Sequence, residues 1–244
     1  MADRSRIEWT EATWNPVRGC TKISAGCQNC YAEAFAERWR GIPGHPYEQG
    51  FDLRLVPEML DLPFRWKNPR KIFVNSMSDL FHVGVPDEYI IDVFEVMRLA
   101  SRHQFQLLTK RAERLTELSP RLPWPQNVWV GVTIENQATA NRLKYLLAIP
   151  AQIKFISFEP LLGHVDIDLN GVGWVIVGGE SGPHARPLDL EWVRDIRNHC
   201  TKAGVPLFLK QLGGRREKRG KQKAILDGQQ WHEFPLAKQL LAVA

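Results

Sequence analysis

Residues 128–158 read VWVGVTIENQATANRLKYLLAIPAQIKFISF, and this stretch decides the fold class. Its two ends, Val128–Thr133 and Ile153–Phe158, are short and almost uninterrupted apolar segments, which is typical of strands buried on both faces. Between them, Asn136–Ile149 carries apolar residues at helical spacing and is predicted to be an amphipathic helix. A strand, a helix and a second strand in this order predict parallel strands joined by a right-handed crossover.

The same unit repeats along the chain and predicts an α/β fold: a TIM-like parallel βα barrel, partial or full, over residues 1–212. No glycine-rich dinucleotide fingerprint follows the first strand, which disfavours a doubly wound sheet. The other predicted strands are Thr13–Arg18, Lys71–Asn75, Phe105–Thr109, Trp174–Val177 and Val205–Lys210. The other predicted helices are Tyr31–Trp39, Asp87–Ser101, Arg111–Leu118 and Leu190–Ala203, the last with Asp189 as N-cap and Gly204 past its end.

The end of the chain follows a different pattern, and residues 213–244 are predicted to be an appendage of the barrel. A basic stretch is followed by Asp227-Gly228 between two short apolar segments, which is a strong signal for a two-residue β-hairpin. The appendage is therefore predicted to be a basic loop and a hairpin.

Composition limits the class of protein. The chain has 244 residues, of which 44% are hydrophobic and 24% charged, as in an ordinary globular protein. It contains no apolar run of about 20 residues and does not begin with the apolar core of a signal peptide, so we expect a cytoplasmic protein with no membrane partner. A net charge of +5 suits a polyanionic partner.

Three of the four cysteines, Cys20, Cys27 and Cys30, lie within eleven residues and predict a metal site. Thiolates favour zinc or iron–sulfur clusters. A structural zinc site takes four protein ligands, whereas three thiolates without a fourth ligand suit a cluster with one open iron. Zinc completed by His45 or His82 is the alternative. The remaining cysteine, on the apolar face of the last helix, is predicted to be a buried packing residue.

Polar residues follow the ends of six predicted strands, where barrel enzymes collect their active sites. Inward-pointing charges at a barrel mouth are costly unless they are paired or used. These positions therefore predict a lined site. The predicted catalytic residues are Lys110, Glu159, Glu180 and Lys210.

A cysteine loop that follows a first barrel strand resembles that of radical S-adenosylmethionine (SAM) enzymes. The whole chain resembles a phage-associated family of uncharacterised three-cysteine proteins, and distantly the DNA repair enzymes related to spore-photoproduct lyase. Two features depart from the radical-SAM pattern: six residues separate Cys20 from Cys27, where three are usual, and Asn29 stands where an aromatic residue is usual. The matching segments are IEWTEATWNPVRGC, GCQNCYA, FVNSMSDLFH, FQLLTKR, VWVGVTIEN, FISFEPLLG, WVIVGGESG, FLKQLG and LDGQQWHEFP.

This resemblance implies that the three thiolates hold a [4Fe-4S] cluster whose open iron binds SAM. One-electron reduction then splits SAM into methionine and a 5′-deoxyadenosyl radical. It also implies a flavodoxin- or ferredoxin-like reductant and a separately encoded three-Cys-motif partner protein. The implied cofactor-binding residues are Ser76, Asp79, Thr133, Glu135, Gly178 and Gly179.

A nucleic acid is the predicted substrate, for repair or base modification, because basic residues lie beside the aromatic residues Trp39 and Trp231. Three alternatives remain: a phage-encoded enzyme that modifies a nucleotide or a protein, a zinc-stabilised nucleic-acid-binding protein without catalysis, and a cluster-bearing partner subunit that lacks SAM chemistry. The predicted nucleic-acid-binding residues are Arg38, Arg40, Arg215, Arg216, Lys218 and Arg219.

Overall fold

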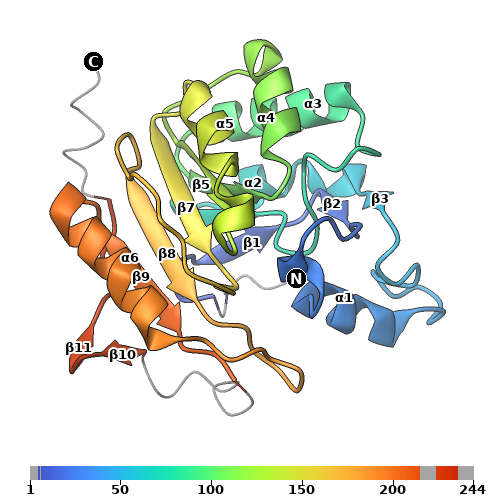
Figure 1. Ribbon diagram of the computed structural model, residues 1–244. Helices are drawn as coiled ribbons and strands as arrows, with labels where there is room; N and C mark the ends of the chain where they lie inside the picture. The colour runs from blue at the N-terminus through green and yellow to red at the C-terminus, as the bar shows by residue number, and fades with distance from the viewer. Residues whose placement is uncertain (1–4, 6, 215–223, 236–244) are drawn as a thin grey trace.

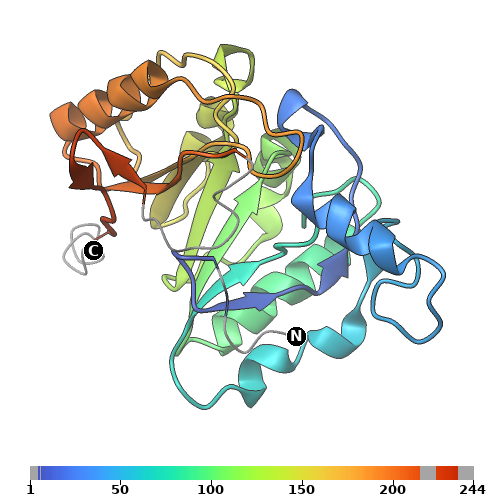
Figure 2. The same cartoon turned by 90° about the horizontal axis from the view of Figure 1, so that it is seen from below.

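The computed structural model describes residue 5, residues 7–214 and residues 224–235, and its centre is a seven-stranded parallel sheet (Figure 1). Its strands follow the chain order β1-β4-β5-β6-β7-β8-β9, and the sheet curls into a half-barrel (Figure 2). The predicted parallel α/β architecture is therefore confirmed, as an incomplete barrel. The strands are β1 (Ala12–Trp14), β4 (Lys71–Val74), β5 (Gln104–Thr109), β6 (Val128–Thr133), β7 (Ile153–Phe158), β8 (Trp174–Gly178) and β9 (Leu207–Gln211).

Helices flank the curled sheet, and α6 runs in front of β8 and β9 in Figure 1. The predicted start and end of α6 are confirmed: the Asp189 side chain accepts a hydrogen bond from Glu191 N, and Gly204 is left-handed at φ 66°. No helix in the described part of the chain is long and apolar enough to cross a bilayer. The α-helices are α1 (Tyr31–Ala36), α2 (Leu62–Arg65), α3 (Asp87–Leu99), α4 (Ala112–Leu118), α5 (Arg142–Ala148) and α6 (Leu190–Ala203). The 3₁₀ turns are η1 (Ala25–Cys27), η2 (Glu37–Trp39), η3 (Pro57–Met59), η4 (Ser119–Arg121) and η5 (Gln137–Thr139).

The predicted single strand Thr13–Arg18 is wrong. The sheet strand β1 ends at Trp14, and a separate strand β2 (Val17–Arg18) pairs antiparallel with β3 (Arg54–Leu55). Pro16 lies between them and has no backbone N–H for a strand ladder, while its carbonyl accepts from Val56 N at 2.8 Å. The chain therefore turns away from the sheet just before the cysteines.

The predicted helix over Asn136–Ile149 is also divided, into η5 and α5. The hydroxyl of Thr139 accepts hydrogen bonds from the backbone N–H of Glu135 at 2.9 Å and of Asn136 at 3.3 Å. These bonds keep residues 135–139 in a separate short turn, which does not continue into the α-helix. The helix proper then begins three residues further on, at Arg142.

The face of the sheet that points away from the helices is layered. Alternate residues of a strand share a face, so Phe155 and Ser157 of β7 both point into the curl. Gly131 leaves room for the Phe155 ring, because a Cβ at Gly131 would lie 2.4 Å from it. A separate aromatic cluster thus fills the amino-terminal end of the curl, below polar groups at the carboxyl end. Its aromatic members are Trp9, Phe73, Trp129, Phe155, Trp174 and Phe208.

The predicted hairpin is confirmed as β10 (Ile225–Leu226) and β11 (Gln229–Gln230), with Asp227 and Gly228 at φ 52° and 78°. The chain then runs beside β9, where the carbonyl of Trp231 accepts from Leu209 N at 2.7 Å. Phe234 stacks on Trp174 at 5.3 Å between ring centroids. The segment that follows the hairpin, 231–234, therefore closes the aromatic end of the half-barrel. Residues 215–223, which contain the predicted basic loop, lie outside the described residues.

Candidate functional site

The cysteine loop, residues 19–30, crosses the carboxyl ends of the sheet strands. It starts at Gly19, which bridges to Ser78 beyond the end of β4, and it ends at Cys30, the N-cap of α1. Gly19 has a φ of 78°, and a Cβ there would lie 2.1 Å from the carbonyl oxygen of Asp52. Cys20, Cys27 and Cys30 are partly exposed and form no disulfide. The three thiols therefore lie on a loop at the carboxyl end of the sheet, and their role as cluster ligands stays a prediction.

The first anchor of the loop is Thr21, at the β4 and β5 end of the mouth. Arg111 Nη2 donates to the carbonyl oxygen of Thr21 at 3.2 Å and to its hydroxyl at 2.9 Å. The same hydroxyl lies 2.9 Å from His82 Nε2, and His82 Nδ1 accepts from Gly84 N at 3.0 Å. Burial, together with the nearby Arg111 charge, lowers the pKa of His82. Both ring nitrogens are thus engaged, Nε2 with the cysteine loop and Nδ1 with the β4–α3 connection of His82 itself.

The second anchor is Glu135, just past the end of β6. Its fully buried carboxylate accepts from the Ser24 hydroxyl at 2.6 Å and from Arg142 Nη1 at 3.3 Å. A Cβ at Gly26 would lie 2.6 Å from Glu135 Oε1, so any larger residue at that point of the loop would displace the Glu135 side chain. Oε2 of Glu135 is buried and has no hydrogen-bond partner among the described residues.

The third anchor is Glu180, just past the end of β8. Its carboxylate accepts from Asn29 Nδ2 at 2.9 Å and from the Arg186 guanidinium at 2.6 and 2.9 Å. Arg186 also donates to the carbonyl oxygen of Ala25 at 2.9 Å. Burial, which raises the pKa of Glu180, is outweighed by these hydrogen bonds, and the pKa is lowered. The cysteine loop is therefore fixed at three separate strand ends.

The environment of the thiols is half-apolar. Cys20 and Cys30 pack against the small buried cluster that includes Ala32 and Phe51, while Cys27 Sγ lies 3.7 Å from the Ser24 hydroxyl. Burial and the Asp79 carboxylate raise the pKa of Cys20 to about 11, against the opposing effect of Arg111.

A site for a single metal ion such as zinc would need its ligands close together around one point. In residues 7–214 and 224–235, no three His, Cys, Asp or Glu side chains are gathered as one metal ion requires. His45, an alternative zinc ligand, stacks on Trp39 at 4.1 Å between centroids, and its Nδ1 accepts from Tyr47 N. A [4Fe-4S] cluster needs thiolates spaced more widely than a single ion does, because each binds a different iron.

Three of the predicted catalytic residues lie in one row across the inner face. Lys110 Nζ is 3.4 Å from the hydroxyl of Thr133, and Lys210 Nζ is 2.6 Å from Glu159 Oε1. Glu159 Oε2 accepts from the Ser157 hydroxyl at 3.1 Å. This row runs from β5 to β9 above the aromatic cluster. The fourth predicted residue, Glu180, instead makes the loop anchor described above.

The predicted cofactor residues of the β4 end are held by the protein itself. Asp79 accepts from the Thr109 hydroxyl at 2.7 Å and from Lys110 N at 3.0 Å. Ser76 donates to Asn15 Oδ1 at 3.2 Å. These contacts place both residues at the mouth, and their role toward SAM stays a prediction.

The glycine pair after β8 is explained by packing. A Cβ at Gly178 would lie 2.9 Å from Glu159 Oε1, and one at Gly179 would lie 2.3 Å from the carbonyl oxygen of Leu212. The first glycine makes room for the Glu159 side chain and the second for the β9 end. Thr133, the remaining predicted cofactor residue, is buried in the row beside Lys110.

Arg186, which joins the β8 end to the cysteine loop, was not predicted from the sequence, nor were the loop-bracing roles of Arg111 and Asn29. Asn29 and Glu180 are 151 positions apart, so no local pattern connects them. The signal available was the concentration of charged residues directly after strand ends. Arg186 lies six positions beyond Glu180 and fell outside that window.

The predicted nucleic-acid residues are placed unevenly. Arg40 is neutralised by Glu37 at 2.6 Å and Asp52 at 2.8 Å. Arg38 is exposed and forms no ion pair within the described chain. The last four fall outside the described residues: Arg215, Arg216, Lys218 and Arg219.

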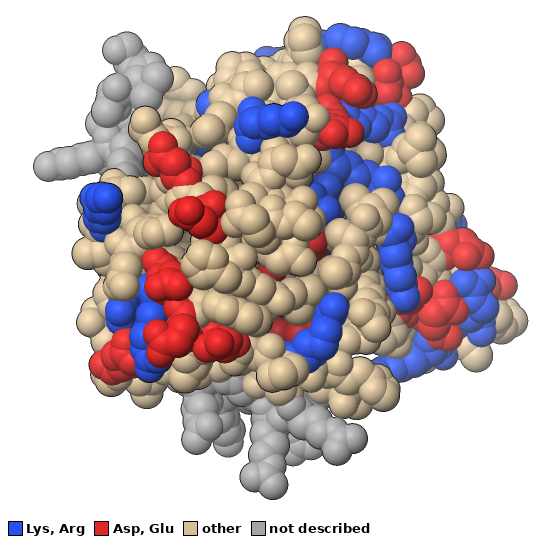
Figure 3. Space-filling view, viewed as in Figure 1, with Lys and Arg blue, Asp and Glu red and all other residues tan. Residues whose placement is uncertain are grey.

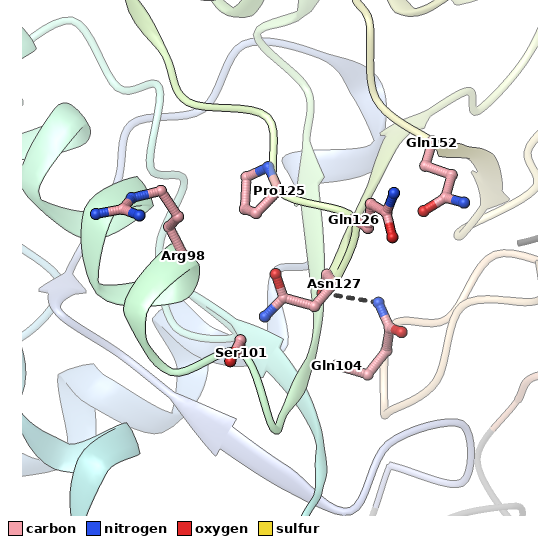
Figure 4. A pocket seen from close by; sticks show the side chains of 7 residues that line it. All are labelled: Arg98, Ser101, Gln104, Pro125, Gln126, Asn127 and Gln152. Atoms are coloured by element: carbon pink, nitrogen blue, oxygen red, sulfur yellow. Dashed lines mark hydrogen bonds between the residues drawn. The ribbon is translucent and has the colours of Figure 1, made fainter. Parts of the chain in front are cut away.

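The described surface includes the following two hollows. One, of about 360 Å³, lies at the amino ends of β5, β6 and β7, where Gln104 Nε2 donates to the carbonyl of Asn127 at 2.7 Å (Figure 4). That end of a barrel usually serves stability. The other, of about 490 Å³, lies beside the cysteine loop and is lined by Ile23, Lys110 and Arg111 among others. Only the second adjoins the candidate site.

The family described as "Protein of unknown function (DUF5131)" matches residues 4–235. No curated protein and no solved structure has a significant match to the chain. The family match covers every strand of the half-barrel, the cysteine loop and the hairpin. The chain belongs to the DUF5131 family.

Proposed function

We propose that this chain is a radical-SAM-like enzyme in which Cys20, Cys27 and Cys30 hold a [4Fe-4S] cluster that binds SAM. The observation that carries the proposal is the cysteine loop itself: three free thiols fixed over the polar mouth of a half-barrel. Three soft ligands suit a cluster with one open iron. His82, the other candidate fourth ligand, is engaged in bracing Thr21.

The chain's own residues hold the cysteine loop rigidly in place. The anchors at Thr21, Glu135 and Glu180 hold the loop from three directions, so the thiols keep their positions before a cluster arrives. Supporting hydrogen bonds of this kind normally orient metal ligands and tune the metal. Glu180 acts here as a positioning residue, through Arg186 and Asn29.

The bound cofactors would supply a 5′-deoxyadenosyl radical on one-electron reduction. The row of Lys110, Ser157, Glu159 and Lys210 would bind and orient the substrate below the cysteine loop. The aromatic cluster beneath this row keeps the floor of the site dry. Glu135 Oε2, a buried acceptor without a described partner, is suited to a donor group of SAM.

A nucleic acid is the proposed substrate, for repair or base modification, and the chain's charge of +5 supports this. A flavodoxin- or ferredoxin-like protein is the proposed reductant. A separately encoded three-Cys-motif protein is a proposed partner, and phage association is part of the same proposal.

The test is reductive SAM cleavage. Protein reconstituted anaerobically with iron and sulfide, then given SAM and dithionite, is expected to release 5′-deoxyadenosine, measured by liquid chromatography, even without substrate. Omitting dithionite should abolish the product, because cleavage needs an electron. A reconstituted, brown protein that forms no 5′-deoxyadenosine would contradict SAM chemistry and favour a cluster-bearing partner subunit.

A further inference from the structure

The hollow of about 490 Å³ beside the cysteine loop, here called the rim groove, lies between the starts of α4 and α5. Ile23 of the cysteine loop and Val83 of the β4–α3 connection stand at its edge. Its volume lies within the usual range for ligand pockets. It adjoins the mouth because Lys110 lines the groove and also reaches Thr133 on the inner face.

The groove is basic, and two of its cations are not neutralised. Arg114 is paired with Asp87 at 2.9 Å, and Arg142 with Glu135 at 3.3 Å. Lys110 and Arg111 form no ion pair within the described residues: Lys110 contacts the hydroxyl of Thr133, and Arg111 contacts Thr21 and the neutral Cys20 thiol. Figure 3 shows Lys and Arg side chains gathered where the α4 region meets the amino-terminal segment.

Two carboxylates, Glu113 and Glu117, also line the groove. Glu113 accepts a hydrogen bond from the hydroxyl of Tyr145 at 2.8 Å, at the end of the groove away from the cysteine loop. Both glutamates belong to the exposed face of α4. Positive charge is therefore concentrated at the end of the groove next to the cysteines.

The same end is apolar at its edges. Ile23 is 43% exposed and Val83 is 76% exposed, although both are large hydrophobic residues. A pair of cations between two exposed apolar side chains matches a ligand that combines negative charge with flat apolar groups. Single-stranded nucleic acids are of this kind, since phosphates alternate with bases that have apolar faces.

We propose that the rim groove binds the phosphodiester backbone of a single nucleic-acid strand and leads it past the cysteine loop to the mouth. Phosphates lie against Lys110 and Arg111, and a sugar or base lies against Ile23 and Val83. The inference rests on the proposed function for its choice of nucleic acid. The rim groove differs from the nucleic-acid surface that the sequence predicted around Arg38 and Arg40. Arg40 is already neutralised there by Glu37 and Asp52.

The test uses Val83→Glu, which puts a negative charge into the groove at a side chain that makes no hydrogen bond. Fluorescence anisotropy with a labelled oligothymidylate of about 12 nucleotides is measured across a salt series. Val83→Glu is expected to weaken binding at least about threefold at low salt, because it opposes the phosphates. Val83→Gln, its neutral counterpart, should bind like the natural protein.

Arg111→Gln is the second variant and should weaken binding and reduce the salt slope by about one. Arg65→Gln removes the same charge on α2, where Arg65 pairs with Asp61 on the exposed surface, and should change neither. The proposed binding role of the rim groove would be overturned if Arg111→Gln and Arg65→Gln weakened oligonucleotide binding equally. Unchanged oligonucleotide binding in Val83→Glu would overturn it as well. Polyglutamate competing as well as the oligonucleotide would overturn the assignment to nucleic acid.

Iron and sulfide content and 5′-deoxyadenosine release are measured on the same Val83→Glu sample. Both are expected to equal those of the natural protein, because Val83 is 76% exposed and does not belong to the buried cluster that packs against Cys20 and Cys30. Weakened oligonucleotide binding in protein that carries no cluster would leave the groove standing and refute the proposed function. A normal cluster and normal 5′-deoxyadenosine release with unchanged oligonucleotide binding would refute the groove and leave the proposed function standing.

Discussion

Replacing Cys27 or Cys30 by alanine is expected to remove the cluster and to abolish 5′-deoxyadenosine release, rather than to weaken either. Two thiolates rarely retain a [4Fe-4S] cluster, and nothing else in the described cysteine loop offers a soft ligand. The loss should be visible as colourless protein after anaerobic reconstitution and desalting. Iron per chain and chromatography of the product give the two readings.

Cys200→Ala is the matched control, because the fourth cysteine is buried on α6 and away from the loop. It should keep the cluster and the product while lowering the free energy of unfolding by about 1 kcal/mol through lost packing. A brown Cys27→Ala protein that still cleaves SAM would contradict the ligand assignment. Equal loss of cluster in Cys200→Ala would point to general unfolding instead.

Glu180→Gln is expected to accelerate loss of the cluster severalfold. The substitution removes the buried charge that binds Arg186 and Asn29, and it leaves the Arg186 guanidinium without its anion. The side of the cysteine loop that carries Cys27 and Cys30 is then held less firmly. Release of iron to a chelator, followed by absorbance, measures the rate.

Glu191→Gln serves as control for that variant. Glu191 pairs with Arg194 at 2.5 Å on the exposed side of α6, so the same chemical change there should leave iron release unaltered.

The Glu180 carboxylate stays ionised at neutral pH because its pKa is lowered, so the anchor is lost only as pH falls through that lowered pKa. Iron release from Glu180→Gln at the natural rate, with unchanged circular dichroism, would contradict the anchoring role.

The sequence predicted the sheet well where strands are buried on both faces. The bounds of Val128–Thr133 and Ile153–Phe158 match β6 and β7, since continuous apolar runs have one way to be covered, between a helix layer and an inner cluster. The chain order of strands followed from the regular βα alternation. Cys200 is buried as its position on the apolar helix face predicted.

The prediction failed where local geometry overrides pattern. Pro16 divides the first strand, and Thr139 closes a turn at the start of the α5 segment, although both stretches have the right periodicity. Whether the barrel closes was not predictable either, because closure depends on whether the two edge strands, β1 and β9, come close enough to pair.

The site was predicted in part for a similar reason. Charged residues at strand ends are visible in a sequence, and the row of Lys110, Glu159 and Lys210 was found in this way. Which charges neutralise each other is set by contacts between distant segments, such as Lys210 with Glu159 across 51 positions. The anchors of the cysteine loop belong to this class, and only the fold places them together.

The central claim, that three thiolates hold an iron–sulfur cluster, is tested most directly by metal analysis of protein purified without oxygen. Iron, acid-labile sulfide and zinc are measured per chain, with the visible spectrum before and after dithionite. The account predicts about four irons and four sulfides per chain, little zinc, and an absorption that dithionite bleaches. Colourless protein with one zinc per chain and no sulfide would contradict it and identify a structural zinc site.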